Sequence, residues 1–147
     1  MIDIRSVQPG DRPAWEELFR AYMRFYDRPD EPQSLYDRAW DEFQRDERMH
    51  ALVATVDGLV CGIVHFLVHA NTSAADVCYL QDLYTAEGAR RRGIGAALIA
   101  AVVDRARARD CSRVYWMTQE SNATARRLYD QVADYRGFIR YQIQLTP

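Results

Sequence analysis

The sequence predicts an α/β (α+β) fold in which one mixed β-sheet is flanked by helices. Two patterns support this prediction: segments whose apolar residues alternate as in strands, and segments whose apolar residues recur at helical spacing. These segments follow one another through the 147 residues without a linker long enough to divide them. Residues 1–147 are therefore expected to form a single domain, which is long enough to bury a hydrophobic core.

The first third of the chain is predicted to be mainly helical. A short strand at Ile2–Ser6 precedes a Pro-Gly turn. The helix that follows is predicted to reach about Tyr26, with apolar residues recurring at helical spacing: Trp15, Leu18, Phe19, Tyr22, Phe25 and Tyr26. Prolines 29 and 32 interrupt the pattern, after which a second helix carries Leu35, Trp40 and Phe43 on one side.

Strands dominate from His50 onward. The Asp57-Gly58 dipeptide is a strong hairpin signal between two apolar segments. The expected elements are strands His50–Val56, Leu59–His69 and Cys78–Thr85, helix Gly93–Arg109, strand Arg113–Thr118, helix Ser121–Val132 and a last strand Gly137–Leu145.

Composition excludes several classes of protein. No run of 18 or more apolar residues exists, so no membrane span is expected, and the N-terminus lacks the pattern of a signal peptide. The three cysteines Cys61, Cys78 and Cys111 lie in strand-like surroundings, which favours reduced residues in a cytoplasmic protein. His65 and His69 share a strand face but have no third ligand, so we interpret them as structural and expect no metal site.

Charge is unevenly distributed along the chain. Residues 1–87 hold 8 arginines and 16 acidic residues, whereas residues 88–147 hold 11 arginines and 5 acidic residues; the net charge is −2. A basic half suits an anionic cofactor and an acidic half suits a cationic substrate, although these charges would equally solvate helix surfaces. The overall balance does not indicate nucleic-acid binding.

The segment Arg90-Arg91-Arg92-Gly93-Ile94-Gly95-Ala96 lies between a predicted strand and a predicted helix. Glycines allow close approach of the backbone, and free N–H groups at a helix start bind anionic oxygens. The arginines add charged donors. These features indicate a pyrophosphate site, although a tight turn with solvated arginines would have the same sequence. Neither a Walker sequence nor a complete G-x-G-x-x-G is present.

Two linked motifs make this signal specific. Tyr79-Leu80-Gln81-Asp82-Leu83-Tyr84-Thr85 followed by the arginine-glycine loop resembles motif A of the GNAT superfamily of N-acetyltransferases. The stretch from Val114 to Asn122 and the N-x-x-A-x-x-L-Y helix that begins there resemble motif B. The residue pattern Y-W-x-T-x-E-S-N is especially similar to the histone, polyamine and D-amino-acid acetyltransferase branch.

The resemblance implies a GNAT fold: a central, mostly antiparallel mixed sheet, splayed at the fourth and fifth strands and flanked by four helices. It also implies acetyl-CoA as co-substrate. Backbone groups of the fourth strand would bind the pantetheine arm, the loop would bind the pyrophosphate, and residues at the start of the motif-B helix would contact the pantetheine, although Asn122 also suits a helix cap. The cofactor-binding residues implied are Leu83, Tyr84, Thr85, Arg90, Arg91, Arg92, Gly93, Ile94, Gly95, Ala96, Asn122, Ala123 and Thr124.

Catalytic roles follow from the same resemblance. Tyr129 occupies the motif-B position of a general acid that protonates the coenzyme A thiolate, although it also suits helix packing. The resemblance leaves several candidates for the general base. Gln81, which cannot take a proton, stands where polyamine-acetylating relatives commonly have glutamate. Asp82 acting through water is therefore favoured over Glu120 or solvent alone.

The acceptor is expected to be a primary amine. Phe25, Tyr26 and Asp27 at the first helix end, together with Gln81, are the substrate-binding candidates, since aromatic faces and a carboxylate suit an ammonium group; core packing would explain the aromatics equally. A small-molecule amine is favoured over a protein lysine or N-terminus, and a non-catalytic acyl-CoA-binding module is a third alternative. Apolar Phe138, Tyr141, Ile143 and Leu145 near the C-terminus suit a strand edge, so we also expect a homodimer.

Overall fold

The computed structural model describes all 147 residues, and their contacts divide the chain into two compact units, Met1–Met117 and Thr118–Pro147. Each unit is described by itself. The assignment of one domain to the whole chain stays a prediction. No helix in the structure is long and apolar enough to cross a membrane.

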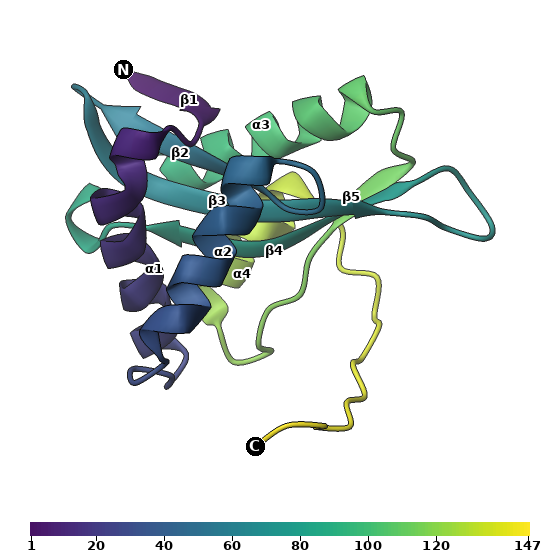
Figure 1. Ribbon diagram of the computed structural model, residues 1–147. Helices are drawn as coiled ribbons and strands as arrows, with labels where there is room; N and C mark the ends of the chain where they lie inside the picture. Colours follow the sequence, from purple (N-terminus) through teal and green to yellow (C-terminus); the bar gives the residue numbers. More distant parts are fainter. The chain divides into compact units, whose positions relative to one another are not determined.

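A five-stranded sheet forms the centre of the first unit (Figure 1). Its strands lie in the order β1-β2-β3-β4-β5, and the first four are mutually antiparallel whereas β5 is parallel to β4. Their bounds are β1 Ile2–Ser6, β2 His50–Val56, β3 Leu59–His69, β4 Val77–Thr85 and β5 Arg113–Tyr115. The predicted mixed, mostly antiparallel sheet is confirmed.

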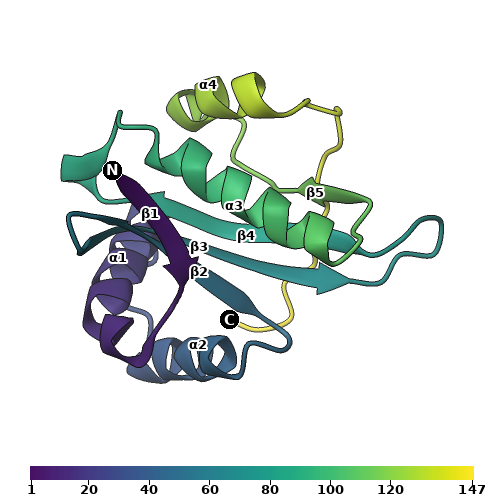
Figure 2. The ribbon, with the colours of Figure 1, turned by 90° about the horizontal axis from the view of Figure 1, so that it is seen from above.

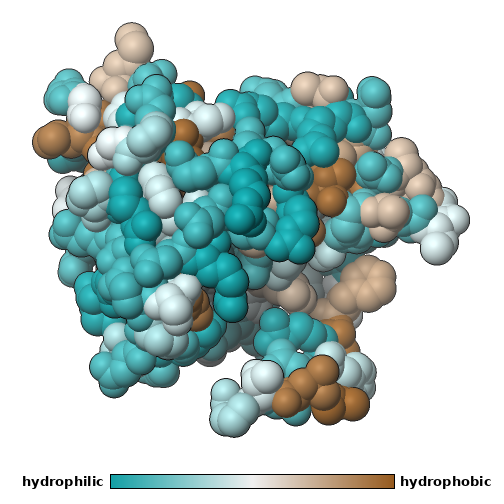
Figure 3. Space-filling view, in the orientation of Figure 1, coloured by the Kyte–Doolittle hydropathy of each residue, from teal (hydrophilic) through white to brown (hydrophobic).

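Helices cover both faces of this sheet (Figure 2). Helices α1 (Arg12–Phe25) and α2 (Gln33–Arg45) pack on one face, and α3 (Ile94–Ala108) packs on the other. Short 3-10 turns, η1 (Pro9–Asp11) and η2 (Glu87–Ala89), precede α1 and the loop before α3. The outer surfaces of α1 and α2 are mainly hydrophilic (Figure 3), and Arg12, Glu16 and Asp37 form ion pairs there.

An aromatic core lies between the sheet and the α1–α2 pair. Trp15 is fully buried, with its ring 5.0 Å from Trp40 and 5.8 Å from Phe43. The opposite core is aliphatic, with Ile94, Leu98 and Val102 of α3 buried against the sheet. The helical spacing in the sequence identified these buried faces because they are the apolar stripes of amphipathic helices.

Gly62 on β3 explains how closely α3 approaches the sheet. A methyl group on this residue would lie 2.8 Å from Cγ2 of Ile94 and 3.1 Å from Cδ1 of Leu98. Contacts this short do not occur between ordinary side chains, so only glycine allows the first turn of α3 to sit at this distance. The position of the loop before α3 therefore depends on Gly62.

The second unit contains α4 (Ala123–Val132) and a C-terminal segment without regular structure. The predicted strand Gly137–Leu145 is wrong, and the predicted strand Arg113–Thr118 ends early, at Tyr115. A strand requires hydrogen bonds to a neighbour, and no segment pairs with residues 133–147. Alternation in the sequence indicates which side chains would share a face, but it supplies no partner.

Candidate active site

Strand β4 leaves part of its outer edge unpaired. It pairs with β5 only over Val77–Tyr79, opposite Arg113–Tyr115, although β4 continues to Thr85. On its inner edge, Asp82 lies opposite His65 and Leu80 lies opposite Phe66, so Gln81 is an extra, bulged residue. Bulges re-aim strands and often adjoin binding sites. The last residues of β4 therefore offer backbone groups to an added extended chain, as the predicted splay of the fourth and fifth strands requires.

The arginine-glycine loop connects β4 to α3. Arg91 (φ 66°) and Gly93 (φ 80°) both have left-handed backbones, and Gly93 is the N-cap of α3. The first intrahelical bond runs from Ala97 N–H to the Gly93 carbonyl at 3.0 Å. The N–H groups of Ile94, Gly95 and Ala96 therefore have no partner within the helix. Ile94 itself is buried, whereas Arg90, Arg91 and Arg92 are exposed. Free amides at a positive helix end beside exposed arginines fit a pyrophosphate.

Arg90 and Tyr84 are held to each other at the end of β4. The Arg90 guanidinium lies 5.4 Å from the centre of the Tyr84 ring, and its Nε donates to the Thr85 carbonyl at 3.3 Å. The half-buried residues Leu83, Tyr84 and Thr85 thus lead directly into the loop. The structure brings together these three residues and the seven residues Arg90–Ala96, all of which were predicted as cofactor contacts.

Asp82 lies on the face of β4 that is covered by α1. Its Oδ2 is 2.8 Å from Nδ1 of His65, and its side chain is 15% exposed. Burial and the neighbouring Asp82 carboxylate, through charge and a hydrogen bond, raise the pKa of Tyr22 far above its ordinary value. Tyr22 therefore stays protonated and donates its O–H toward Asp82. The carboxylate thus lies between His65 of β3 and Tyr22 of α1.

The Tyr22 ring packs against further aromatic rings of α1 and β4. Its ring centre is 4.8 Å from that of Tyr26 and 6.3 Å from that of Tyr84. Among the predicted substrate residues, Tyr26 therefore packs against Tyr22, the tyrosine that interacts with Asp82. Phe25 (56% exposed) contacts Tyr26 at 5.0 Å, and Asp27 and Gln81 are exposed. The faces of such rings attract an ammonium group.

Sequence reasoning missed the polar contacts of three residues: His65 and Tyr22 contact Asp82, and Trp15 contacts His65. Tyr22 and Trp15 were assigned only to an apolar helix face, and His65 only a structural role, whereas His65 contacts Asp82 directly. The contact depends on the bulge at Gln81, which sets the register between β3 and β4. Helical spacing places Trp15 and Tyr22 two turns apart on one side of α1, and that spacing was the available signal.

The second unit contains the remaining predicted residues. Asn122 caps α4, because its Oδ1 accepts a bond from Ala125 N–H at 3.4 Å, and its Nδ2 donates to Thr118 Oγ1 at 3.4 Å. Ala123 and Thr124 form the exposed first turn of α4, and Tyr129 is half-buried in the same helix. The capping role of Asn122 is thereby established, and its contact with pantetheine stays a prediction.

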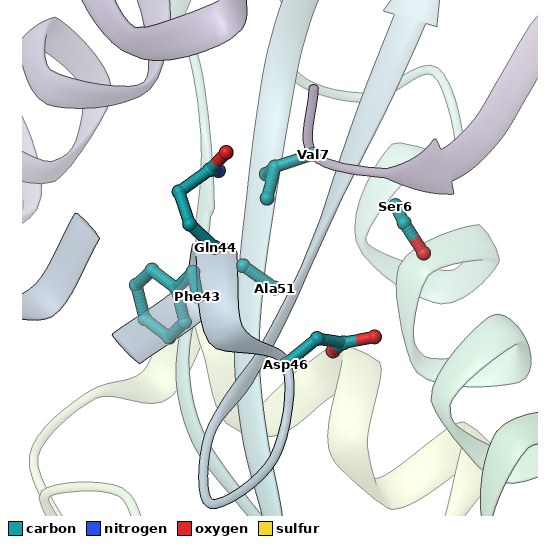
Figure 4. Close-up of a pocket in the computed structure, with 6 residues that line it drawn as sticks. All are labelled: Ser6, Val7, Phe43, Gln44, Asp46 and Ala51. Carbon is teal, nitrogen blue, oxygen red and sulfur yellow. The ribbon is translucent and has the colours of Figure 1, made fainter. Parts of the chain in front are cut away.

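Two hollows in the first unit lie away from the predicted site residues. A cavity of about 160 Å³ is lined by residues of β1, β2 and the end of α2 (Figure 4). A second hollow of about 370 Å³ lies beside the C-terminal end of α3 and includes His50 and Arg109. Neither includes Asp82 or the arginine-glycine loop. No group of three or more His, Cys, Asp or Glu side chains could hold a metal ion.

Known proteins resemble both the sequence and the fold. The sequence model of the acetyltransferase (GNAT) family matches residues 15–135. The D-amino-acid N-acetyltransferase HPA3 of Saccharomyces cerevisiae is 30% identical over 135 residues, which cover 90% of this chain and 84% of the yeast protein. The ribosomal-protein-alanine N-acetyltransferase from Brucella melitensis biovar Abortus 2308 is 26% identical, with a TM-score of 0.81 over 99% of this chain and 100% of that one.

A further solved structure shares the fold at lower identity. The acetyltransferase AAC(6')-Iy, in complex with the bisubstrate analogue CoA-S-monomethyl-acetylneamine, has a TM-score of 0.87 at 16% identity, with 99% of each chain covered. The family match spans most of the chain and includes the strand β4, the arginine-glycine loop and α4. The chain belongs to the acetyltransferase (GNAT) family and is an N-acetyltransferase.

Proposed function

We propose that the protein transfers the acetyl group of acetyl-CoA to a small primary amine, by direct attack within a ternary complex. The observation that carries this proposal is the position of Asp82: a carboxylate flanked by tyrosines, beside the bulge where β4 leaves β5. A carboxylate with aromatic neighbours suits an amine that arrives as an ammonium ion.

The first requirement of the reaction is a neutral amine. A free alkyl amine has a pKa of about 10.4 and arrives protonated at neutral pH. Asp82 binds the ammonium group and accepts a proton from it, through one water molecule where the distance requires it. Tyr22 donates to the same carboxylate and thereby orients it.

Acetyl-CoA supplies a thioester whose carbonyl carbon accepts the amine. The backbone of Leu83–Thr85 and the arginine-glycine loop bind the co-substrate, and an N–H within Leu83–Tyr84 donates to the carbonyl oxygen as charge develops on it. As the C–N bond forms, the C–S bond breaks and Tyr129 gives its phenolic proton to the departing sulfur. The second proton of the amine nitrogen then leaves through water and restores the Tyr129 phenol. Asn122, Ala123 and Thr124 contact the pantetheine near the start of α4. Binding both reactants beside one strand supplies the orientation that the reaction needs.

The acceptor class follows from charge and from similarity. The yeast relative is named as a D-amino-acid N-acetyltransferase, and the fold neighbour AAC(6')-Iy is named as an aminoglycoside N-acetyltransferase. We favour a small cationic metabolite such as a polyamine or amino acid, which would meet Tyr26, Phe25, Asp27 and Gln81 at the α1 end of the site. The second candidate is a protein amine, because the exposed Phe25 suits a peptide acceptor and the 26%-identical neighbour is named for a ribosomal protein.

An acetyl-CoA-dependent assay of thiol release tests the proposal. The panel comprises polyamines, D- and L-amino acids, aminoglycosides and peptides with free N-termini or lysines. Release that depends on a small amine supports the proposed function, whereas release with peptides alone supports the second candidate. If acetyl-CoA binds but no amine stimulates release, the proposed function is overturned in favour of an acyl-CoA-binding module.

The protein is further proposed to act as a cytoplasmic homodimer. The free thiols Cys61, Cys78 and Cys111 suit a reducing compartment. Four apolar side chains of the C-terminal segment are almost fully exposed: Phe138 (87%), Tyr141 (87%), Ile143 (86%) and Leu145 (90%). A second copy would bury them. A monomeric mass at micromolar concentration would contradict the dimer.

A further inference from the structure

A chain of hydrogen bonds links the buried core to Asp82. Nε1 of Trp15 lies 2.9 Å from Nε2 of His65, and Nδ1 of His65 lies 2.8 Å from Oδ2 of Asp82. Trp15 and His65 are both fully buried, so water does not compete for these bonds. The three residues come from α1, β3 and β4, so the chain connects separate elements of the first unit.

The chemistry of the groups fixes the direction of these bonds. An indole N–H can only donate, so Nε2 of His65 is the acceptor and carries a lone pair. A neutral imidazole has one N–H, and it must therefore be on Nδ1. His65 then donates to Asp82, whose Oδ2 is the acceptor at the end of the chain. The hydrogen-bond geometry thus assigns the tautomer of His65.

Packing immobilises the imidazole in this orientation. Its ring stacks on Phe43 at 4.4 Å and meets the edge of Phe19 at 4.8 Å. The ring therefore cannot turn to exchange its two nitrogens. The Trp15 hydrogen occupies the Nε2 lone pair, and Nδ1 already carries a hydrogen. His65 consequently has no position at which to take a proton from Asp82.

On these grounds, and resting on the proposed function, we propose that Trp15 and His65 are positioning residues that hold Asp82 as an ionised acceptor for the ammonium group of the substrate. Asp82 receives hydrogens from His65 and Tyr22, and a carboxylate has about four acceptor positions, so capacity remains for a cationic amine. The proton released by the amine stops at Asp82 or leaves through water, and it does not enter the core.

The surroundings of His65 make this proposal specific. The titratable group in contact with it is Asp82 on β4; Tyr22 on α1 interacts with Asp82, and Tyr26 and Tyr79 interact with Tyr22. The side chain that α2 contributes, Phe43, carries no charge. Loss of the Trp15 donor would free Nε2 to bind a proton. An imidazolium beside Asp82 would neutralise the carboxylate and weaken its attraction for an ammonium group.

Nitrogen NMR of the intact protein is the first test. The proposal predicts that His65 carries its single ring proton on Nδ1 and leaves Nε2 as the acceptor for Trp15. This measurement does not depend on turnover. A wild-type His65 that carries its proton on Nε2, or a proton on each nitrogen, overturns the proposal even if the amine assay succeeds.

Kinetics of variants supply the second test. In Trp15→Phe, the KM for the amine should rise roughly tenfold more than in the wild type as pH falls from about 8 to 5.5. In His65→Leu, the KM for the amine should rise at least about tenfold at pH 8, with the dissociation constant of acetyl-CoA unchanged. His65→Gln, which can accept from Trp15 and donate to Asp82, should recover most of the loss.

A matched control exists on the other face of the sheet. His50 has similar partners, with Nδ1 2.6 Å from Asp46 and Nε2 2.9 Å from Arg109, but it lies beside the end of α3. His50→Gln should leave the amine KM and its pH dependence unchanged. If His65→Leu changes stability but not the amine KM, His65 is merely structural and the proposal is overturned, while the amine assay still decides the proposed function. Circular dichroism confirms that each variant is folded.

Discussion

His65 on β3 lies directly opposite Asp82 on β4, with 2.8 Å between Nδ1 and Oδ2. The bulge at Gln81 creates this pairing, because it shifts the register by one residue between Leu80 and Asp82. Without the shift, Asp82 would point to the α3 face, since successive side chains of a strand alternate between faces. One irregular residue therefore determines that the acidic group faces the tyrosines of α1.

Asp82→Asn should retain acetyl-CoA binding and lose most amine acetylation. The amide cannot accept the proton of the ammonium group, so the expected fall in kcat/KM is roughly 10²- to 10⁴-fold. Steady-state kinetics with varied amine give kcat/KM, and calorimetry checks that acetyl-CoA binding is retained. An unchanged kcat/KM in the variant would remove Asp82 from proton transfer.

Tyr129→Phe should lower kcat by roughly 10²- to 10⁴-fold, because the departing thiolate loses its acid. Stopped-flow and steady-state measurements at saturating amine provide kcat, and calorimetry provides the dissociation constant of acetyl-CoA, which should not change. Tyr135→Phe is a suitable control, since Tyr135 is a largely exposed tyrosine of the same unit. An unchanged kcat in Tyr129→Phe would rule out the proposed acid.

Gly62→Ala should weaken acetyl-CoA binding without touching the co-substrate. The added methyl group would lie 2.8 Å from Ile94 Cγ2, so the first turn of α3 must move away together with the loop before it. We expect the dissociation constant of acetyl-CoA to rise roughly tenfold, because small displacements weaken pre-organised contacts. Gly10→Ala is the matched control, since nothing lies within 4 Å of its added methyl. Equal affinities in both variants would contradict this account.

Asp11→Asn should reduce stability by about 1–3 kcal/mol at neutral pH, the range for a hydrogen-bonded charged group. Asp11 is buried and accepts from Arg5 at 2.6 and 3.0 Å and from Gln8 N–H at 2.7 Å. The hydrogen bond from Arg5 lowers the pKa of Asp11 below its ordinary value. A lowered pKa stabilises the folded state above the unfolded value of about 3.9, and this contribution is lost as pH falls further.

Urea unfolding at several pH values checks this prediction. The difference in unfolding free energy between wild type and Asp11→Asn should be constant near neutrality and shrink below about pH 4. A difference that stays constant into strong acid would show that the charge of Asp11 does not contribute.

Most of the fold could be predicted from the sequence because most helices and turns are indicated by residues within their own segment. Asp57-Gly58 fixed a hairpin, and helical spacing identified the buried stripe that includes Trp15. The loop at Gly93 could be predicted because its glycines and arginines lie together in one short segment. The last strand was wrong because pairing is not local: Phe138 and its neighbours alternate correctly but have no partner strand.

The same distinction explains the site. Asp82 was identified from its place in a motif, whereas its contact with His65 depends on a bulge that no spacing rule reveals. Tyr22 was assigned to the core from its spacing, and the structure shows that its hydroxyl also serves the carboxylate. Contacts that depend on the tertiary fold were therefore not predicted, whereas the linear motifs supplied the candidate site residues, whose roles stay predictions.

The most direct test of the central claim is acetyl-CoA-dependent thiol release with a panel of small amines, measured for wild type and Asp82→Asn in parallel. The account predicts release that requires an amine, saturates with it, and falls by at least about 10²-fold in the variant. Release that ignores every small amine, or that is equal in the two proteins, would contradict it.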